Sequence, residues 1–100
     1  TPPKHYQMLA ERYPQVLTAV QALGKTVQTA GPLDEKTVRL VQLAAAAAER
    51  STGSVQSHAR RAKEAGASRA EIDHALLCLT STLGFPNVAA ALSWVEEALK

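Results

Sequence analysis

The sequence has few of the residues that build cross-linked or strongly charged proteins. Its 100 residues include one cysteine, so neither an intramolecular disulfide nor a cysteine-based metal cage can form within the chain. The first residues, Thr-Pro-Pro-Lys-His, are polar and have no apolar run behind them, so we expect no signal peptide. A net charge of +2 is too small to predict nucleic-acid binding. We expect a single cytoplasmic domain spanning residues 1–100.

Large side chains are also scarce. Aromatic residues make up 4% of the chain, whereas alanine, the best helix former, makes up about a fifth. No segment alternates between apolar and polar residues as a half-buried strand would. The sequence therefore predicts an all-α fold, a compact bundle of about six helices. Because a small chain with small side chains buries little apolar surface, we also expect a homo-oligomer that completes the core.

Proline, glycine and capping residues divide the chain into six helical segments. The first covers residues 5–13, and Pro14 can open the second, which Gly31 and Pro32 close. Asp34 is a good N-cap for the third. The fourth begins near Ser51 and runs to residue 65, with a glycine after it. The last two cover residues 69–83, behind a capping box formed by residues 68–71, and residues 86–95.

Residues 75–95 contain no charged side chain, which raises the question of a membrane span. Gly84, Pro86, Asn87 and several hydroxyl groups interrupt this stretch, and a spanning helix needs about 20 predominantly apolar residues. Two buried helices joined by a tight turn explain the stretch better. We therefore predict no membrane partner.

Ser51, Ser54 and His58 form the densest polar cluster beside an apolar stretch. Intervals of three and four residues place them on one face of the fourth helix, provided that the helix begins by Ser51. Ser54 and His58 could then form a nucleophile activated by a base. Alternatively, Ser51 caps the helix and Ser54 lies in its first turn, which is the more common use of serine at such positions.

Two other groups of polar residues have a structural and a functional interpretation. His74 and Cys78 are four residues apart, but a zinc site needs three or four protein ligands. We predict no metal and no cofactor there, and expect a buried cysteine beside a surface histidine. The basic residues near the fourth helix form either a solvated face or a site for an anionic ligand such as a carboxylate. They are Arg50, Arg60, Arg61, Lys63 and Arg69.

Several motifs in this order resemble the carboxymuconolactone decarboxylase and alkylhydroperoxidase D-like superfamily. They are the segment 31–37, an alanine-rich helix, His58, the segment 65–68, residues 71–72 and the turn 84–86. The resemblance covers about residues 14–98. It implies an all-helical domain that assembles into dimers, trimers or hexamers, with active sites near subunit contacts.

The peroxidase branch of the superfamily carries a Cys-x-x-Cys pair and a histidine four residues after the second cysteine. The corresponding positions here are Ser51, Ser54 and His58, and the glutamate that relays protons in that branch corresponds to Arg39. A serine hydroxyl cannot form a disulfide, so these residues cannot reduce peroxides by the dithiol reaction of that branch. A thiol peroxidase would require Cys78 to act across a subunit boundary.

The decarboxylase branch lacks the cysteine pair and resembles this chain around His58 and Arg60. This resemblance implies an enzyme for a small carboxylate or lactone, with His58 as acid or base and Arg39 or Arg60 binding the anion. If Arg39 faces His58, its charge should keep the imidazole neutral near pH 7. The alternative is a non-catalytic member whose oligomer binds a small ligand or a protein.

Overall fold

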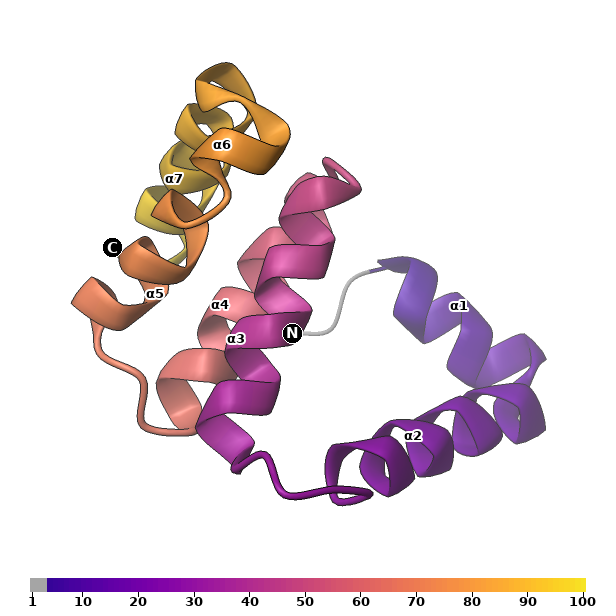
Figure 1. Cartoon of the computed structure of the whole chain (residues 1–100). Helices are drawn as coiled ribbons and strands as arrows, with labels where there is room; N and C mark the ends of the chain where they lie inside the picture. The colour runs from indigo at the N-terminus through magenta and orange to yellow at the C-terminus, as the bar shows by residue number, and fades with distance from the viewer. Residues whose placement is uncertain (1–3) are drawn as a thin grey trace. The chain divides into compact units, whose positions relative to one another are not determined.

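The computed structural model describes residues 4–100, and every regular element in that range is a helix (Figure 1). The predicted all-α class is thereby confirmed. The chain divides into two compact units, one ending at Leu33 and the other covering Asp34–Lys100. The single domain predicted from the length stays a prediction. The helices are α1 (Lys4–Arg12), α2 (Pro14–Gln28), α3 (Glu35–Ala48), α4 (Thr52–Glu64), α5 (Arg69–Leu77), α6 (Thr80–Leu83) and α7 (Phe85–Ala98).

The first unit is a helical hairpin made of α1 and α2. Pro14 opens α2 as predicted, because a proline in the first turn sacrifices only an N–H that has no partner within the helix. The Gln21 side chain donates a hydrogen bond of 2.6 Å to the hydroxyl oxygen of Tyr6, which joins the two helices. Neither helix contains a buried residue. This hairpin therefore has no core of its own.

In the second unit, the predicted caps form at the starts of three helices. The Asp34 side chain accepts a hydrogen bond from the backbone N–H of Thr37 at 2.8 Å, at the start of α3. Ser68 and Glu71 form the complete capping box of α5. Ser51 caps α4. Each cap satisfies an N–H group that has no partner within its own helix.

Small side chains let the helices of the second unit pack closely. The core is built from α3, α4, α5 and α7, and α3 and α4 lie side by side (Figure 1). Ion pairs join helices at the surface: Lys36 and Glu71 link α3 to α5 at 2.8 Å, and Arg69 and Glu96 link α5 to α7 at 3.0 Å. The fully buried side chains are Leu43, Val55, Ala59, Ala62, Ile72, Leu76, Val88, Ala91 and Val95.

The predicted fifth helix is broken, which gives seven helices in residues 4–100 instead of six. The backbone N–H of Leu79 bonds to the carbonyl of Leu76, three residues back, and the Thr80 hydroxyl donates to the carbonyl of Leu77 at 2.8 Å. These bonds replace the regular helical pattern, as hydroxyl side chains often do. Within residues 4–100 no helix is long and apolar enough to cross a membrane.

Candidate functional site

The turn between α3 and α4 places the candidate residues. Arg50 has a φ of 56°, in the left-handed region, and its N–H bonds to the carbonyl of Ala47. The N–H of Ser51 bonds to the carbonyl of Ala46, which completes the double hydrogen bond that often ends a helix. The Ser51 hydroxyl then accepts a hydrogen bond from the N–H of Ser54 at 3.4 Å and starts α4. Ser51 therefore contributes both to the end of α3 and to the start of α4.

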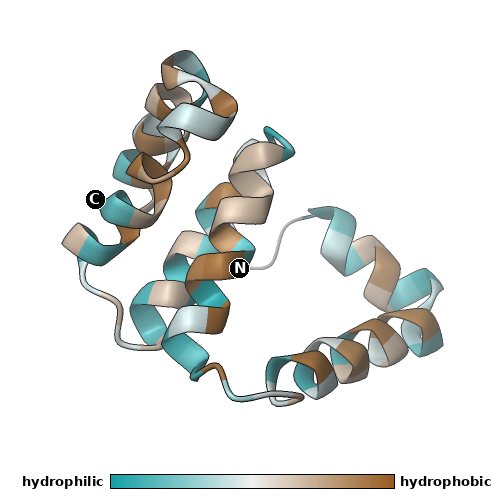
Figure 2. Ribbon diagram, in the orientation of Figure 1, coloured by the Kyte–Doolittle hydropathy of each residue, from teal (hydrophilic) through white to brown (hydrophobic). Residues whose placement is uncertain are grey.

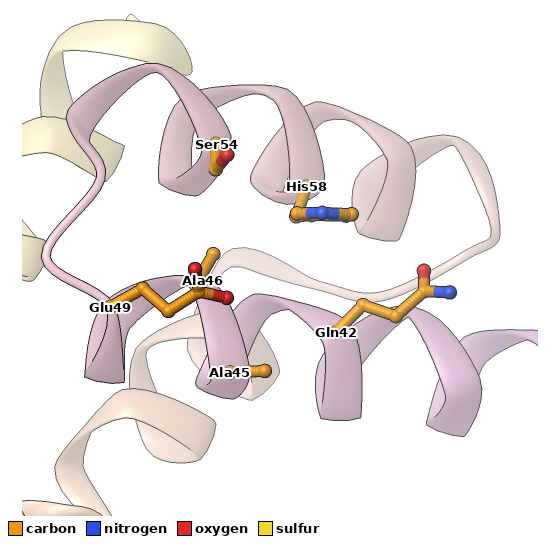
Figure 3. A pocket seen from close by; sticks show the side chains of 6 residues that line it. All are labelled: Gln42, Ala45, Ala46, Glu49, Ser54 and His58. Atoms are coloured by element: carbon orange, nitrogen blue, oxygen red, sulfur yellow. The ribbon is translucent and has the colours of Figure 1, made fainter. Parts of the chain in front are cut away.

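An open pocket of about 260 Å³ lies between α3 and α4 (Figure 3). Two of its lining residues, Ala45 and Ala46, have side chains too small to fill the space between the helices. Ser54 and His58 line it from α4, so the structure brings these two predicted residues together. The six lining residues are Gln42, Ala45, Ala46, Glu49, Ser54 and His58.

The imidazole of His58 is partly buried in this pocket. Burial lowers the pKa of His58 below its ordinary value of 6.5, and the positive charges of Arg61 and Arg39 lower it further. The ring is therefore neutral at pH 7. Its Nδ1 atom is buried and has no hydrogen-bond partner. The charge of Arg39 lowers the pKa of His58 in the expected direction, but burial of the ring lowers this pKa more.

Ser51 and Ser54 have different surroundings. Ser51 is the N-cap of α4 and does not line the pocket, which matches the structural interpretation of this residue. Ser54 lies in the first turn of α4 and does line the pocket. Of the two hydroxyl groups, the one on Ser54 is therefore in a position to meet a ligand.

The three arginines near His58 also differ in position. Arg39 is half-buried on α3, and its Nη1 donates a hydrogen bond of 3.2 Å to Oε1 of Gln42, which lines the pocket. Arg60 is exposed and is not among the lining residues. Arg61, which lies one turn after His58, is the α4 arginine whose charge acts on the imidazole. The positive charge at the site thus comes from Arg39 and Arg61.

Sequence reasoning missed two polar residues of the pocket, Gln42 and Glu49. Together with Ala45 and Ala46 they recur at intervals of three, one and three residues, which places all four on one face of α3. A face of small residues bounded by polar ones is the signal that could have identified them. Glu49 adds a carboxylate to the pocket, and in Figure 3 it lies beside Ala46, on the wall opposite Ser54.

The expectation of a buried cysteine is wrong. Cys78 is exposed, because it lies two residues after Leu76 and six after Ile72, which places it on the side of the helix away from the buried face. His74 is exposed on α5. Within residues 4–100, no three His, Cys, Asp or Glu side chains gather as a metal site would require.

No curated protein matches the chain. The family model described as "Carboxymuconolactone decarboxylase family" matches residues 14–97, a range that includes all of α2–α6, nearly all of α7 and every residue of the pocket. The match covers well over half of the sequence. The chain therefore belongs to the carboxymuconolactone decarboxylase family.

Proposed function

We propose that the pocket between α3 and α4 binds a small carboxylate or lactone and that His58 transfers a proton to or from it. The observation that carries this proposal is a neutral imidazole lining an open pocket and acted on by two arginine charges. Such a site attracts an anion. It also holds a group that can accept a proton near neutral pH.

The arginines and the histidine have complementary roles in this proposal. Arg39 and Arg61 supply the positive charge that a carboxylate needs, and arginine can bind a carboxylate through two parallel hydrogen bonds. A bound carboxylate would offset these charges beside the imidazole and so raise the pKa of His58. Ligand binding would thus favour the protonated ring.

This coupling suits a decarboxylation. When the bond between carbon and the carboxylate breaks, the electron pair stays on the carbon, CO₂ leaves, and the carbon takes a proton. The imidazolium of His58, charged by solvent on ligand binding, would supply that proton through Nε2, because Nδ1 is buried. The Ser54 hydroxyl and the Gln42 amide would position the ligand by hydrogen bonds from the pocket wall.

The proposal is tested by turnover and by binding. Purified protein is incubated with γ-carboxymuconolactone and with related small carboxylic acids, and CO₂ release and product formation are followed. Turnover should fall at least about 100-fold in His58→Ala, as expected for loss of an acid–base group. It should not change in His74→Ala, which removes an exposed histidine outside the pocket. Turnover that survives His58→Ala would contradict the proposal.

Binding without turnover would favour the alternative, a non-catalytic member of the family. In that case a carboxylate should still shift the NMR signals of His58, and Arg61→Gln should weaken its binding. A dithiol peroxidase is disfavoured because serines occupy positions 51 and 54. Hydroperoxide consumption with a dithiol donor that is lost in Cys78→Ser would overturn this exclusion.

A further inference from the structure

The pocket between α3 and α4 has a carboxylate at one end, that of Glu49. This residue is the C-cap of α3 and follows Gln42 by seven residues, so the two lie about 10 Å apart along the helix. Ala45 and Ala46 line the pocket between them. Figure 2 shows the same change in polarity, because the hydrophilic colour returns at the connection between α3 and α4, after the run of alanines. A ligand lying along α3 would therefore meet an apolar surface and then a negative charge.

The positive charges of the site lie at the opposite end of the pocket. Arg39 is one turn before Gln42 on α3 and donates a hydrogen bond to its side chain. Because α4 runs back alongside α3 after the short connection (Figure 1), Ser54 lies nearer to this connection and Arg61 lies further from it. The pocket therefore has a basic end, at Arg39 and Arg61, and an acidic end, at Glu49.

The fold does not need the charge of Glu49. Its side chain is exposed and forms no hydrogen bond or ion pair within residues 34–100. The hydrogen bonds that end α3 use its backbone N–H, which bonds to the carbonyls of Ala45 and Ala47. A negative charge at the C-terminal end of a helix is also unfavourable, because the helix dipole is negative there. Arg50, the next residue, is not among the lining residues. The Glu49 carboxylate is therefore available to a ligand.

We infer that the pocket takes an amino carboxylate, a molecule with a carboxylate at one end and an ammonium group at the other. The carboxylate would bind at the basic end beside His58, and the ammonium group would donate hydrogen bonds to Glu49 at the acidic end. The inference rests on the proposed function, because it uses the carboxylate site assigned there. It narrows the substrate class of that site and makes Glu49 a residue that determines specificity.

Two other kinds of carboxylate fit the acidic end less well. A dicarboxylate would place its second negative charge beside that of Glu49, and like charges repel. A carboxylate with an apolar tail would cover part of the Glu49 side chain without giving it a hydrogen-bond partner, which is unfavourable for a charged group. An ammonium group avoids both costs.

The test compares three ligands with the same six-carbon chain, which differ only at the end away from the first carboxylate: ε-aminocaproate, caproate and adipate. Their dissociation constants are measured from NMR shifts of the His58 imidazole in the full chain, in wild type and in Glu49→Gln. Each ligand is compared with itself between the two proteins, so differences in ligand hydration cancel. Glu49→Gln should weaken the binding of ε-aminocaproate about fivefold and strengthen that of adipate about fivefold, as expected for one exposed charge. Caproate should change less than about twofold, because its carboxylate lies about a Debye length away.

Two further variants separate a local effect of Glu49 from a general effect of charge. In wild type ε-aminocaproate should bind more tightly than adipate, and Glu49→Lys should reverse this order. Glu97→Gln removes the same charge from an exposed position of α7 outside the pocket and should leave all three affinities unchanged. Circular dichroism should show the same helix content in all variants, because both glutamates are exposed.

Two outcomes would overturn this inference alone. If ε-aminocaproate and adipate do not respond to Glu49→Gln in opposite directions, the far end of the ligand does not meet Glu49. If Glu97→Gln has the same effect as Glu49→Gln, the preference reflects the net charge of the protein. Failure of the proposed function would look different: caproate would not shift the His58 signals, or Arg61→Gln would not weaken its binding, and the inference would fail with it.

Discussion

The hydroxyl oxygen of Ser51 accepts a hydrogen bond from the backbone N–H of Ser54, 3.4 Å away, so one serine caps the helix on which the other meets the pocket. The two serines therefore have separate roles. Ser51 contributes to folding, whereas Ser54 is available to a ligand.

Substitution should separate these two roles. Ser51→Ala removes the cap and should lower the free energy of unfolding by about 0.5–2 kcal/mol. Ser54→Ala keeps the cap, because the bond uses its backbone N–H, and should change stability by less than about 0.5 kcal/mol. Urea denaturation followed by circular dichroism measures both. Equal losses in the two variants would show that the Ser51 hydroxyl does not act as the cap.

The pKa of His58 should depend on the neighbouring arginines in a position-specific way. In wild type it should lie below 6.5, and Arg61→Gln should raise it, because one of the charges that lowers it is removed. Part of the shift should remain, since burial is the larger cause. Arg60→Gln removes the same charge one residue away and should have the smaller effect. NMR titration of the imidazole signals measures all three proteins.

The free energy of unfolding should also depend on the protonation of His58. Because the pKa of His58 is lowered in the folded state, the unfolded chain takes up more protons once the pH falls below about 6.5. The free energy of unfolding should therefore decrease as the pH falls through that range toward the folded-state pKa. His58→Gln should remove this part of the pH dependence. An unchanged dependence in the variant would assign it to other groups.

A second loss of stability is expected at lower pH and is due to Glu71. The hydrogen bond from Lys36 is the largest cause that lowers the pKa of this carboxyl below its ordinary value of 4.5, and the bond from the Ser68 backbone adds to it. Its contribution is complete above pH 4.5 and is lost as the pH falls through the folded-state value. Glu71→Gln should flatten this part of the curve. Salt should weaken the effect, because the ion pair is partly exposed.

Stability of the second unit should depend on Leu43, which is fully buried on α3. Leu43→Ala should lower the free energy of unfolding by about 2–5 kcal/mol, since it leaves a cavity in a closely packed core. Val41→Ala lies on the same helix but is 55% exposed, and it should cost less than about 1 kcal/mol. Chemical denaturation compares the two variants. A small loss in Leu43→Ala would mean that the core collapses around the missing side chain.

Local sequence signals predicted the helix starts well. The caps at Asp34 and Ser51 and the box at Ser68 form as expected, because each depends on residues within four positions of one another. The break after Leu77 was missed. There a hydroxyl side chain competes with the helical hydrogen bonds, and the apolar spacing continues unchanged across the break.

The pocket could be predicted only in part. Ser54 and His58 share a helix face, so their spacing was enough to bring them together. Gln42 and Glu49 come from another helix, and which face of α3 meets α4 depends on packing that spacing alone does not supply. Arg61 follows from helix geometry, since residues three apart share a face and residues two apart, such as His58 and Arg60, do not.

The connection between α3 and α4 at residues 49–51 is short, because Ser51 takes part both in the hydrogen bonds that end α3 and in the cap that starts α4. Inserting or deleting a single residue there would rotate α4 by about 100° about its own axis. His58 would then leave the pocket wall, and Val55 and Ala59 would leave the core at the same time. The length of this short connection is thus constrained by chemistry and by folding together, and variation in loop length is expected elsewhere in the chain.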